Sequence, residues 1–171
     1  MVAAIPHVVF VCTGNAARSV MAGAVLSHIG GARVVTAGTM VIEGLPMSWR
    51  TRRALEELGV TEPAHRSRQL SDADARDADL IVCFETFHVE YVRRTHPEAA
   101  MKTATIRRLV RDLPSTSASL GERVGALGLA DLELEEWENV EDPAGGELEV
   151  IVACAQEVAA LVDKLAAAVR S

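Results

Sequence analysis

The segment HVVFV, residues 7–11, constrains the fold of this chain more than any other stretch. Consecutive β-branched and aromatic residues suit a central strand of a parallel sheet, because such a strand is covered on both faces. After a short polar loop, Arg18–Ile29 is predicted to form a helix that ends at Gly30 and Gly31. A buried strand that leads through a loop into a helix is the opening unit of an α/β fold.

Strands and helices continue to alternate along the chain. The further predicted strands are Arg33–Thr36, Asp79–Val82 and a short one near Met101–Thr105. The further predicted helices are Trp49–Leu58, with Ser48 as N-cap and Gly59 as stop, Thr86–Arg94 and Glu147–Val169. We therefore expect one domain, residues 1–171, in which helices cover both faces of a mostly parallel sheet. Ligands of such folds bind at the carboxyl ends of the strands, where Cys12 lies.

Residues 113–139 depart from this alternation. The segment contains Pro-Ser-Thr-Ser near its start and becomes acidic towards its end, with Asp131, Glu133, Glu135, Glu136 and Glu138. We expect a mobile surface excursion with a short helix near Leu120–Leu127. Three arginine pairs elsewhere are expected on solvated helix faces: Arg52-Arg53, Arg93-Arg94 and Arg107-Arg108.

The charge balance narrows the class of partner. The 171 residues include 17 Lys and Arg against 24 Asp and Glu, a formal net charge of -7. This balance argues against general binding to nucleic acid or to an anionic membrane. No apolar run is long enough to cross a bilayer, and the N-terminus lacks the basic start of a signal peptide. Three cysteines without a CxxC pair favour a reducing, cytoplasmic setting over a disulfide framework or a zinc site.

The loop CTGNAARS, residues 12–19, joins a thiol to an arginine through small residues. Backbone N–H groups can converge between a strand and a helix N-terminus, so an anion is the expected guest. Gly14 can adopt a backbone conformation closed to other residues, and Asn15 tolerates a left-handed one. Arg18 offers paired donors to two phosphate oxygens. The same surroundings would stabilise a thiolate on Cys12, to which Ser19 could donate a hydrogen bond.

A thiolate that attacks phosphorus needs a proton donor for the departing oxygen. The candidate is Asp142 in EDPAGG, residues 141–146, where Pro143 stiffens the turn. This acid could protonate the leaving group and then deprotonate the water that hydrolyses a phosphocysteine. Glu141 is an adjacent carboxylate, and the chemistry alone leaves it open as the donor.

At this point the chain resembles the low-molecular-weight protein tyrosine phosphatase family. The shared motifs are CTGNAARS at 12–19, TAGT at 36–39, Gly44 to Pro46, HRSRQL at 65–70, ADLIV at 78–82 and DPAGG at 142–146. The resemblance implies a three-layer α/β sandwich with a four-stranded parallel sheet in the order 2-1-3-4. It also implies a phosphocysteine mechanism that uses no metal and no cofactor.

The resemblance assigns roles to residues of this chain. Cys12 is implied as the nucleophile, Arg18 as the phosphate clamp and Asp142 as general acid and then base. Asn15 and Ser19, with His65, are implied to support the loop through hydrogen bonds. The remaining phosphate-loop positions are Thr13, Gly14, Ala16 and Ala17.

The chain also departs from the family pattern at the expected substrate pocket. Ala17 stands where a second cysteine commonly precedes the arginine, so a local protective disulfide is not available to Cys12. Ile42 and Ala144 stand at positions that usually hold aromatic walls. Each missing ring contact removes about 0.5–1.5 kcal/mol of recognition. An aromatic residue such as Trp137 would compensate if it folded over the pocket.

The leading hypothesis is a phosphomonoester hydrolase of the tyrosine phosphatase type that acts on phosphorylated proteins. Two related activities stay open. The DPAGG turn resembles that of the protein arginine phosphatase branch, although Ala16 matches neither the threonine of that branch nor the bulky aliphatic residue of tyrosine-specific members. Arsenate reduction with a thiol donor is a minor alternative, since Cys83 and Cys154 lack the close spacing of a cysteine relay. A catalytically weak phosphate-binding regulatory module is the remaining alternative, and the sequence predicts no particular oligomeric state.

Overall fold

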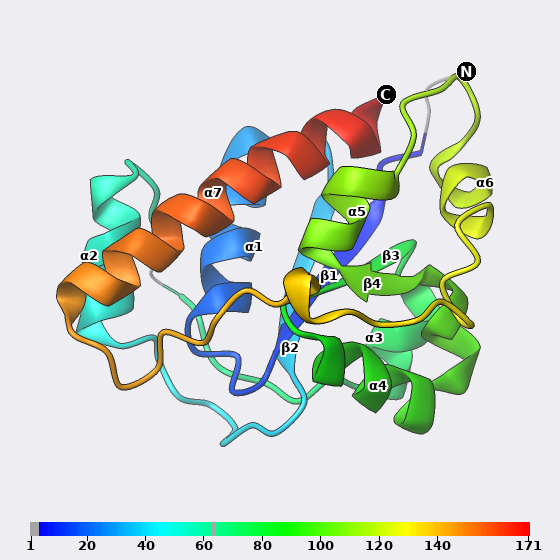
Figure 1. Ribbon diagram of the computed structural model, residues 1–171. Helices are drawn as coiled ribbons and strands as arrows, with labels where there is room; N and C mark the ends of the chain where they lie inside the picture. Colours follow the sequence, from blue (N-terminus) through cyan, green and yellow to red (C-terminus); the bar gives the residue numbers. More distant parts are fainter. Residues whose placement is uncertain (1–3, 63) are drawn as a thin grey trace.

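The computed structural model describes residues 4–62 and 64–171 and has a central four-stranded parallel sheet (Figure 1). The strands are β1 (His7–Cys12), β2 (Arg33–Gly38), β3 (Leu80–Cys83) and β4 (Thr103–Thr105). Their order is β2-β1-β3-β4, with parallel pairing throughout. The predicted parallel sheet with order 2-1-3-4 is therefore confirmed, and β1 occupies the interior position that its apolar sequence indicated.

Helices cover both faces of the sheet (Figure 1). The α-helices are α1 (Arg18–Ile29), α2 (Trp49–Glu57), α3 (Asp72–Asp77), α4 (Thr86–Thr95), α5 (Ile106–Asp112), α6 (Leu120–Gly125) and α7 (Leu148–Arg170). Two short 3-10 helices are η1 (Pro97–Lys102) and η2 (Glu136–Glu138). Within the described residues, no helix combines the length and the apolar composition needed to cross a membrane.

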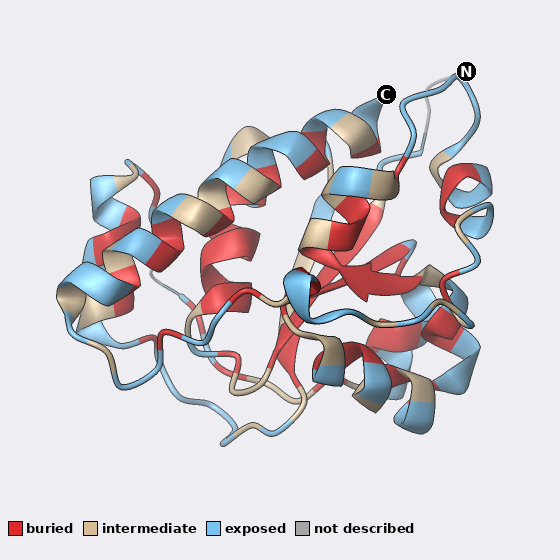
Figure 2. Ribbon diagram, in the orientation of Figure 1, coloured by how far each residue is buried: buried red, intermediate tan, exposed pale blue. Residues whose placement is uncertain are grey.

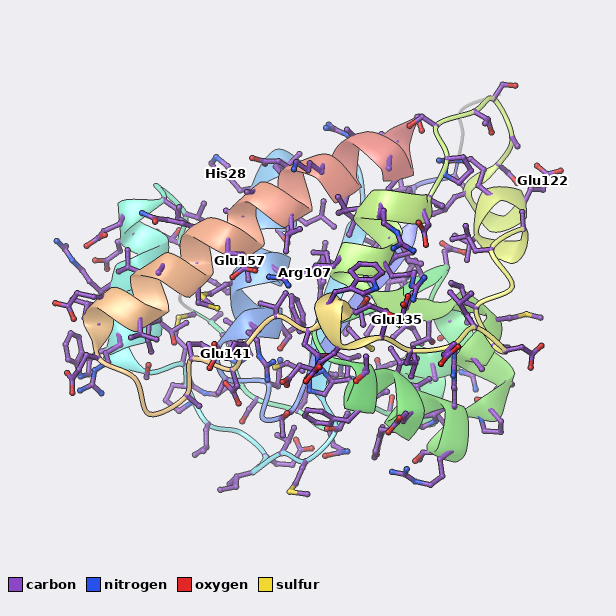
Figure 3. The ribbon with its side chains drawn as sticks, in the orientation of Figure 1. His28, Arg107, Glu122, Glu135, Glu141 and Glu157 are labelled. Carbon is purple, nitrogen blue, oxygen red and sulfur yellow. The ribbon has the colours of Figure 1, made fainter. Side chains whose placement is uncertain are left out.

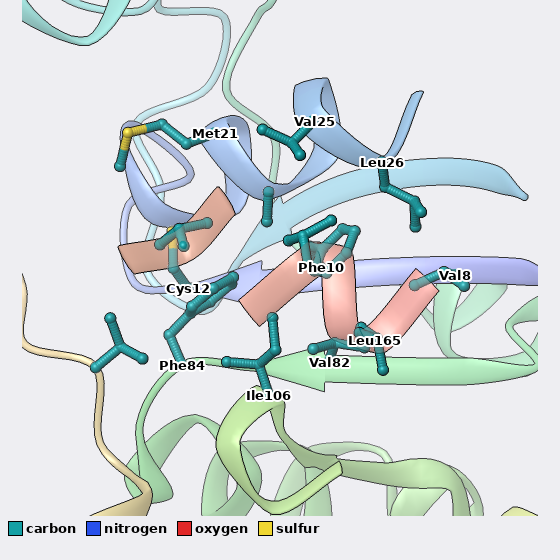
Figure 4. Close-up of a cluster of buried hydrophobic side chains, with 14 of the residues drawn as sticks. Val8, Phe10, Cys12, Met21, Val25, Leu26, Val82, Phe84, Ile106 and Leu165 are labelled. Carbon is teal, nitrogen blue, oxygen red and sulfur yellow. The ribbon is translucent and has the colours of Figure 1, made fainter. Parts of the chain in front are cut away.

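The core is divided by the alternation of side chains along the strands. Val8, Phe10 and Cys12 of β1 point into one buried cluster, which α1, α5 and α7 close (Figure 4). Val9 and Val11 point into a second cluster on the other face of the sheet. Figure 2 shows that the strands are buried and that the helices are exposed on their outer sides. Every residue of β1 is buried, as its sequence predicted.

Several boundaries differ from the sequence prediction. The strand expected near residues 101–105 begins only at Thr103, because Pro97 starts the 3-10 helix η1 that occupies residues 97–102. Helix α3 was not predicted, since its sequence DADARD has almost no apolar periodicity. A capping box between Ser71 and Asp74 holds it instead. For α5 the sequence placed Arg107-Arg108 on a helix face without giving bounds, and the helix follows β4 directly with Thr105 as its N-cap.

Residues 113–139, predicted as an excursion, contribute to the interior at several points. The segment contains α6 within the predicted range and η2 near its end. Val124 and Leu129 join the first core cluster, and Glu138 is fully buried. The prediction that Arg107-Arg108 forms a solvated face is wrong for Arg108, which is 5% exposed and pairs with Glu138.

Candidate functional site

The loop between β1 and α1 turns its peptide N–H groups towards one side. The carbonyl oxygens of Cys12 and Thr13 accept hydrogen bonds from Thr39 and Met40, each at 3.0 Å. In a trans peptide the following N–H points the opposite way, so the N–H groups of Thr13 and Gly14 face away from residues 39–40. The Asn15 carbonyl accepts a bond from His65, which directs the next N–H in the same manner. These donors, with the start of α1, form a cradle for an anion.

A chain of hydrogen bonds ends at the sulfur of Cys12. The backbone N–H of Arg68 donates to Asn15 Oδ1 at 3.0 Å, and Asn15 Nδ2 donates to Ser19 Oγ at 2.9 Å. Ser19 Oγ lies 2.9 Å from Cys12 Sγ. Because the Ser19 hydroxyl already accepts a bond from Asn15, its own proton is free to donate to the sulfur. The arrangement thus gives the sulfur of Cys12 a hydroxyl donor that is itself held in place by Asn15.

Asn15 adopts the left-handed conformation that was predicted, with φ of 50°. Its side chain also bonds Thr36 Oγ1 at 3.0 Å, which ties the loop to β2. The prediction for Gly14 is wrong: its φ is not positive, and a Cβ there would meet only Ala16 Cβ at 3.9 Å. The glycine that the loop requires is Gly38, at the end of β2. A Cβ on Gly38 would lie 2.4 Å from Thr13 O and 2.9 Å from Asn15 N.

His65 lies behind the loop and bonds its backbone. Nε2 is 2.9 Å from the Asn15 carbonyl oxygen, so this nitrogen carries a proton. Burial lowers the pKa of His65 below its ordinary value, and the bond to Asn15 opposes that shift only in part. His65 is therefore a neutral donor to the loop at pH 7, in the place that the resemblance implied.

Arg18 is the most enclosed charged side chain of the site, at 2% exposure. Its Nη1 donates to Glu85 Oε2 at 2.6 Å and to the Val140 carbonyl oxygen at 2.8 Å. Its Nη2 lies 3.4 Å from Asp142 Oδ2. One guanidinium thus connects the anion cradle with the turn that carries Asp142, and Glu85 and Val140 fix its orientation.

Thr13, which follows Cys12, is held by a buried histidine of α4. His88 Nδ1 accepts the backbone N–H of Glu85, so Nε2 carries the proton and donates to Thr13 Oγ1 at 2.9 Å. Burial and the nearby positive charge of Arg18 lower the pKa of His88 to about 3. The imidazole is therefore neutral at pH 7 and serves as a fixed donor.

The turn that carries Asp142 meets the phosphate-binding loop at Arg18. Asp142 Oδ1 accepts the backbone N–H of Ala144 at 3.0 Å, while Oδ2 faces Arg18. The Asp142 side chain is 45% exposed, so it can exchange protons with solvent. Glu141 is also exposed, but within the described residues no ion pair joins it to Arg18. This difference favours Asp142 over Glu141 as the proton donor that the sequence left open.

The predicted pocket walls are open to solvent. Ile42 is 74% exposed, and Ala144 and Ala16 are exposed as well. The suggestion that Trp137 folds over the pocket is wrong, because its ring lies 4.1 Å from the Arg111 guanidinium. An exposed aromatic residue, Phe87, contacts the histidine that bonds Thr13: its ring centroid lies 4.3 Å from that of His88.

The other two cysteines lie near Cys12 in space but differ in setting. Cys83 pairs in register with Val11 and belongs to the cluster on the opposite face of the sheet. Cys154 of α7 shares the cluster of Cys12 and lines a surface cavity of about 320 Å³ with Asp142. Burial raises the pKa of Cys154 to about 11 and raises that of Cys83 further. Both were predicted as core residues, and both are buried.

Three residues of the site were missed from the sequence: Glu85, His88 and Arg68. Glu85 and His88 follow β3 within a few residues, at the same sheet edge as Cys12. The rule that ligands gather at the carboxyl ends of parallel strands could have pointed to them. Arg68 contributes a backbone N–H, for which the sequence holds no side-chain signal.

Comparisons with known proteins agree with this geometry. The model of the family described as low molecular weight phosphotyrosine protein phosphatase matches residues 7–122. A protein-arginine-phosphatase of Geobacillus stearothermophilus is 32% identical over 162 residues, which cover 94% of this chain and 93% of that protein. A probable low molecular weight protein-tyrosine-phosphatase, EpsP of Ralstonia solanacearum, is 30% identical over 106 residues, covering 61% of this chain and 71% of that protein.

Solved structures give the same assignment. The YwlE arginine phosphatase of Geobacillus stearothermophilus superposes with a TM-score of 0.76 at 30% identity, covering 95% of this chain and 91% of that one. The low molecular weight protein tyrosine phosphatase of T. tengcongensis gives a TM-score of 0.74 at 31% identity, covering 94% and 97%. The chain therefore belongs to the low-molecular-weight protein tyrosine phosphatase family, and it is a phosphatase of that family.

Proposed function

We propose that this phosphatase acts on phosphorylated protein side chains through a phosphocysteine intermediate on Cys12. The Cys12 thiolate attacks phosphorus, and the bond from phosphorus to the leaving group breaks as Asp142 supplies a proton. Asp142 then takes a proton from water, whose oxygen attacks phosphorus. The sulfur–phosphorus bond breaks, inorganic phosphate leaves and the thiolate is restored.

One observation carries this proposal: the Arg18 guanidinium faces the Asp142 carboxylate at 3.4 Å and belongs to the loop that begins at Cys12. Paired donors of an arginine suit the equatorial oxygens of a phosphoryl group in transfer. The Ser19 hydroxyl, 2.9 Å from Sγ, supports the sulfur both as a thiolate and as a departing thiolate.

Within this activity we propose phosphoarginine as the preferred substrate. Its guanidinium leaving group is cationic once protonated, and the carboxylate that Asp142 then carries lies at the cavity beside the turn. The exposed Ile42 and Ala144 offer no ring face for a phosphotyrosine side chain. The similarity to the arginine phosphatase of Geobacillus stearothermophilus also covers 94% of this chain, and this region includes the Asp-Pro turn.

Phosphotyrosine is the second candidate, and it was the leading hypothesis from the sequence. Phe87 favours it, because this residue is 47% exposed and its ring contacts the histidine that bonds Thr13. The similarity to the tyrosine phosphatase of T. tengcongensis, over 94% of this chain, points in the same direction.

The test is a substrate panel with the native protein and with Cys12→Ser. The panel contains a phosphoarginine protein, a phosphotyrosine peptide, 4-nitrophenyl phosphate and arsenate with a thiol donor. We expect hydrolysis of all three phosphorylated compounds by the native protein, fastest for phosphoarginine, and loss of each with Cys12→Ser.

The remaining outcomes separate the alternatives. Binding of inorganic phosphate without turnover by the native protein would refute the proposed activity and favour a regulatory module. Faster hydrolysis of the phosphotyrosine peptide would reverse the order of the two substrates. Reduction of arsenate in place of phosphate release would favour the arsenate alternative.

A further inference from the structure

Three arginines of α5 hold the acidic end of residues 113–139. We call Arg107, Arg108 and Arg111 the arginine clamp. Arg108 Nη2 donates to a carboxylate oxygen of Glu138 at 2.5 Å and to one of Glu135 at 3.1 Å. These acidic side chains lie about thirty positions further along the chain, so the clamp joins two distant parts of the sequence.

The clamp also encloses Trp137. The guanidinium carbon of Arg111 lies 4.1 Å from the Trp137 ring centroid, and that of Arg108 lies 4.9 Å from it. Arg107 Nη1 donates to the Trp137 carbonyl oxygen at 3.1 Å. Arg107 also pairs with Glu157 of α7, as Figure 3 shows from their facing side chains.

Glu138 is the buried centre of this arrangement. Its second carboxylate oxygen accepts the hydroxyl of Thr105 at 2.7 Å, and its side chain is 1% exposed. Burial alone would raise the pKa of Glu138, but the bonds from Arg108 and Thr105 outweigh it and lower the pKa. Glu138 is therefore ionised at neutral pH and remains bound to Arg108.

From Glu138 the chain runs directly to the site. Asn139 Oδ1 accepts the backbone N–H of Thr86 at 2.8 Å. The next residue, Val140, donates its N–H to the Phe84 carbonyl at 2.7 Å and accepts from Arg18 at 2.8 Å. Asp142 follows two residues later. Four residues of extended chain span at most about 14 Å, so the place of Glu138 limits the place of Asp142.

We infer that the arginine clamp positions Asp142 against the phosphate-binding loop. The clamp residues are positioning residues, since they act through residues 138–142 and touch no reacting atom. The buried carboxylate of Glu138 and the more exposed one of Glu135 are thus both bound by Arg108 of α5. The inference rests on the proposed function, because it gives Asp142 the part of proton donor.

The test uses leaving groups of different basicity. Departure of 2,4-dinitrophenolate needs little protonation, whereas departure of phenolate depends on the general acid. Two substitutions, called the clamp variants, break the bond between Arg108 and Glu138: Arg108→Met in the clamp itself and Glu138→Gln in the carboxylate that it binds. Asp142→Asn is the reference for complete loss of the acid. In both clamp variants we expect kcat/KM for phenyl phosphate to fall about tenfold more than that for dinitrophenyl phosphate. A general acid contributes about 10²–10⁴-fold, and a displaced acid loses part of this contribution.

Arg123→Met is the matched control. Arg123 is also a buried arginine, 3% exposed, and it ties the same 113–139 segment to α7 through the carbonyls of Pro114 and Ala168. Its loss removes a buried cation of the same kind but leaves residues 138–142 bound. We expect this variant to be less stable and yet to affect both phosphates by the same factor.

The pH profile distinguishes a displaced Asp142 from a general loss of protein stability. In the pH profile of kcat/KM for phenyl phosphate, we expect the limb that depends on the protonated acid to be weakened in Glu138→Gln, absent in Asp142→Asn and unchanged in Arg123→Met. If a clamp variant does not fold, Asn139→Ala removes the milder anchor at Thr86 and is expected to show the same leaving-group dependence to a smaller extent.

Two results would overturn the inference in a protein that remains active. One is a folded Glu138→Gln or Asn139→Ala variant whose losses on the two phosphates are equal. The other is a leaving-group dependence in Arg123→Met as large as in the clamp variants. A native protein that hydrolyses neither phosphate would instead refute the proposed function.

Discussion

Replacing Gly38 by alanine tests whether the cradle depends on the close approach of β2. The added Cβ would lie 2.4 Å from Thr13 O, 2.9 Å from Asn15 N and 2.4 Å from a methyl of Val41. The first two contacts are with backbone atoms of the loop, so neither can be relieved by rotation of a side chain. Overpacking of this kind costs about 1–3 kcal/mol, and we expect Gly38→Ala to lie at the upper end.

The same substitution at Gly121 in α6 is the control. A Cβ there meets nothing within 4 Å, and alanine favours the helix by about 0.5–1 kcal/mol relative to glycine. The two changes therefore have opposite signs. In thermal unfolding, a loss of about 3 kcal/mol lowers the Tm by roughly 6–12 °C for a chain of this size.

The assay combines thermal unfolding with protection by inorganic phosphate. We expect Gly38→Ala to lower the Tm and to lose most of the increase that phosphate gives the native protein, because the distorted loop no longer directs its N–H groups to one point. The reasoning is refuted if Gly38→Ala unfolds within about 0.5 kcal/mol of the native protein and is stabilised equally by phosphate.

Three further predictions concern titration and reactivity. His88 has a folded pKa of about 3 against about 6.5 unfolded, so the unfolded state binds the proton first and stability falls below pH 6.5. Between pH 7 and pH 5 the native protein should lose about 2 kcal/mol more unfolding free energy than His88→Gln in urea titrations, and equal losses would contradict this. Ser19→Ala removes the hydroxyl 2.9 Å from the sulfur and should slow alkylation of Cys12 at pH 6 about tenfold, whereas an unchanged rate would show that the bond does not support the thiolate. Cys83 and Cys154 should resist iodoacetamide at pH 8 in the folded protein, because burial raises both pKa values, and mass spectrometry that finds either labelled before unfolding would disagree.

The sequence predicted the parts of the fold that depend on apolar patterns close together in the chain. The run at residues 7–11 identified β1, and the helix after it was correct at both ends. Helix α3 was missed because a capping box holds it and its six residues carry almost no apolar periodicity, and the bounds of α5 were missed because seven residues are too few for a pattern to fix them.

The residues of the site also divide into those that are close in sequence, which could be predicted, and those that only the fold brings together. Cys12, Ser19 and Arg18 lie within eight residues, so their meeting could be predicted from local geometry alone. Glu85 reaches Arg18 only because β3 lies beside β1, which requires the tertiary structure. Arg108 was misjudged for a physical reason: an arginine pair is solvated unless acidic partners are brought to it, and Glu138 lies thirty positions away.

The hydrogen bonds that shape the cradle come from behind it, and this has a consequence for how the enzyme can change. Asn15 and His65 hold the loop from the protein side, while Ile42 and Ala144, the positions expected to form the pocket walls, are exposed. Substitutions at these two exposed positions therefore do not disturb the residues on which folding depends. Substrate preference should therefore be able to differ between related proteins without loss of the phosphatase reaction. A small mutant library at these two positions should be able to change it in the same way.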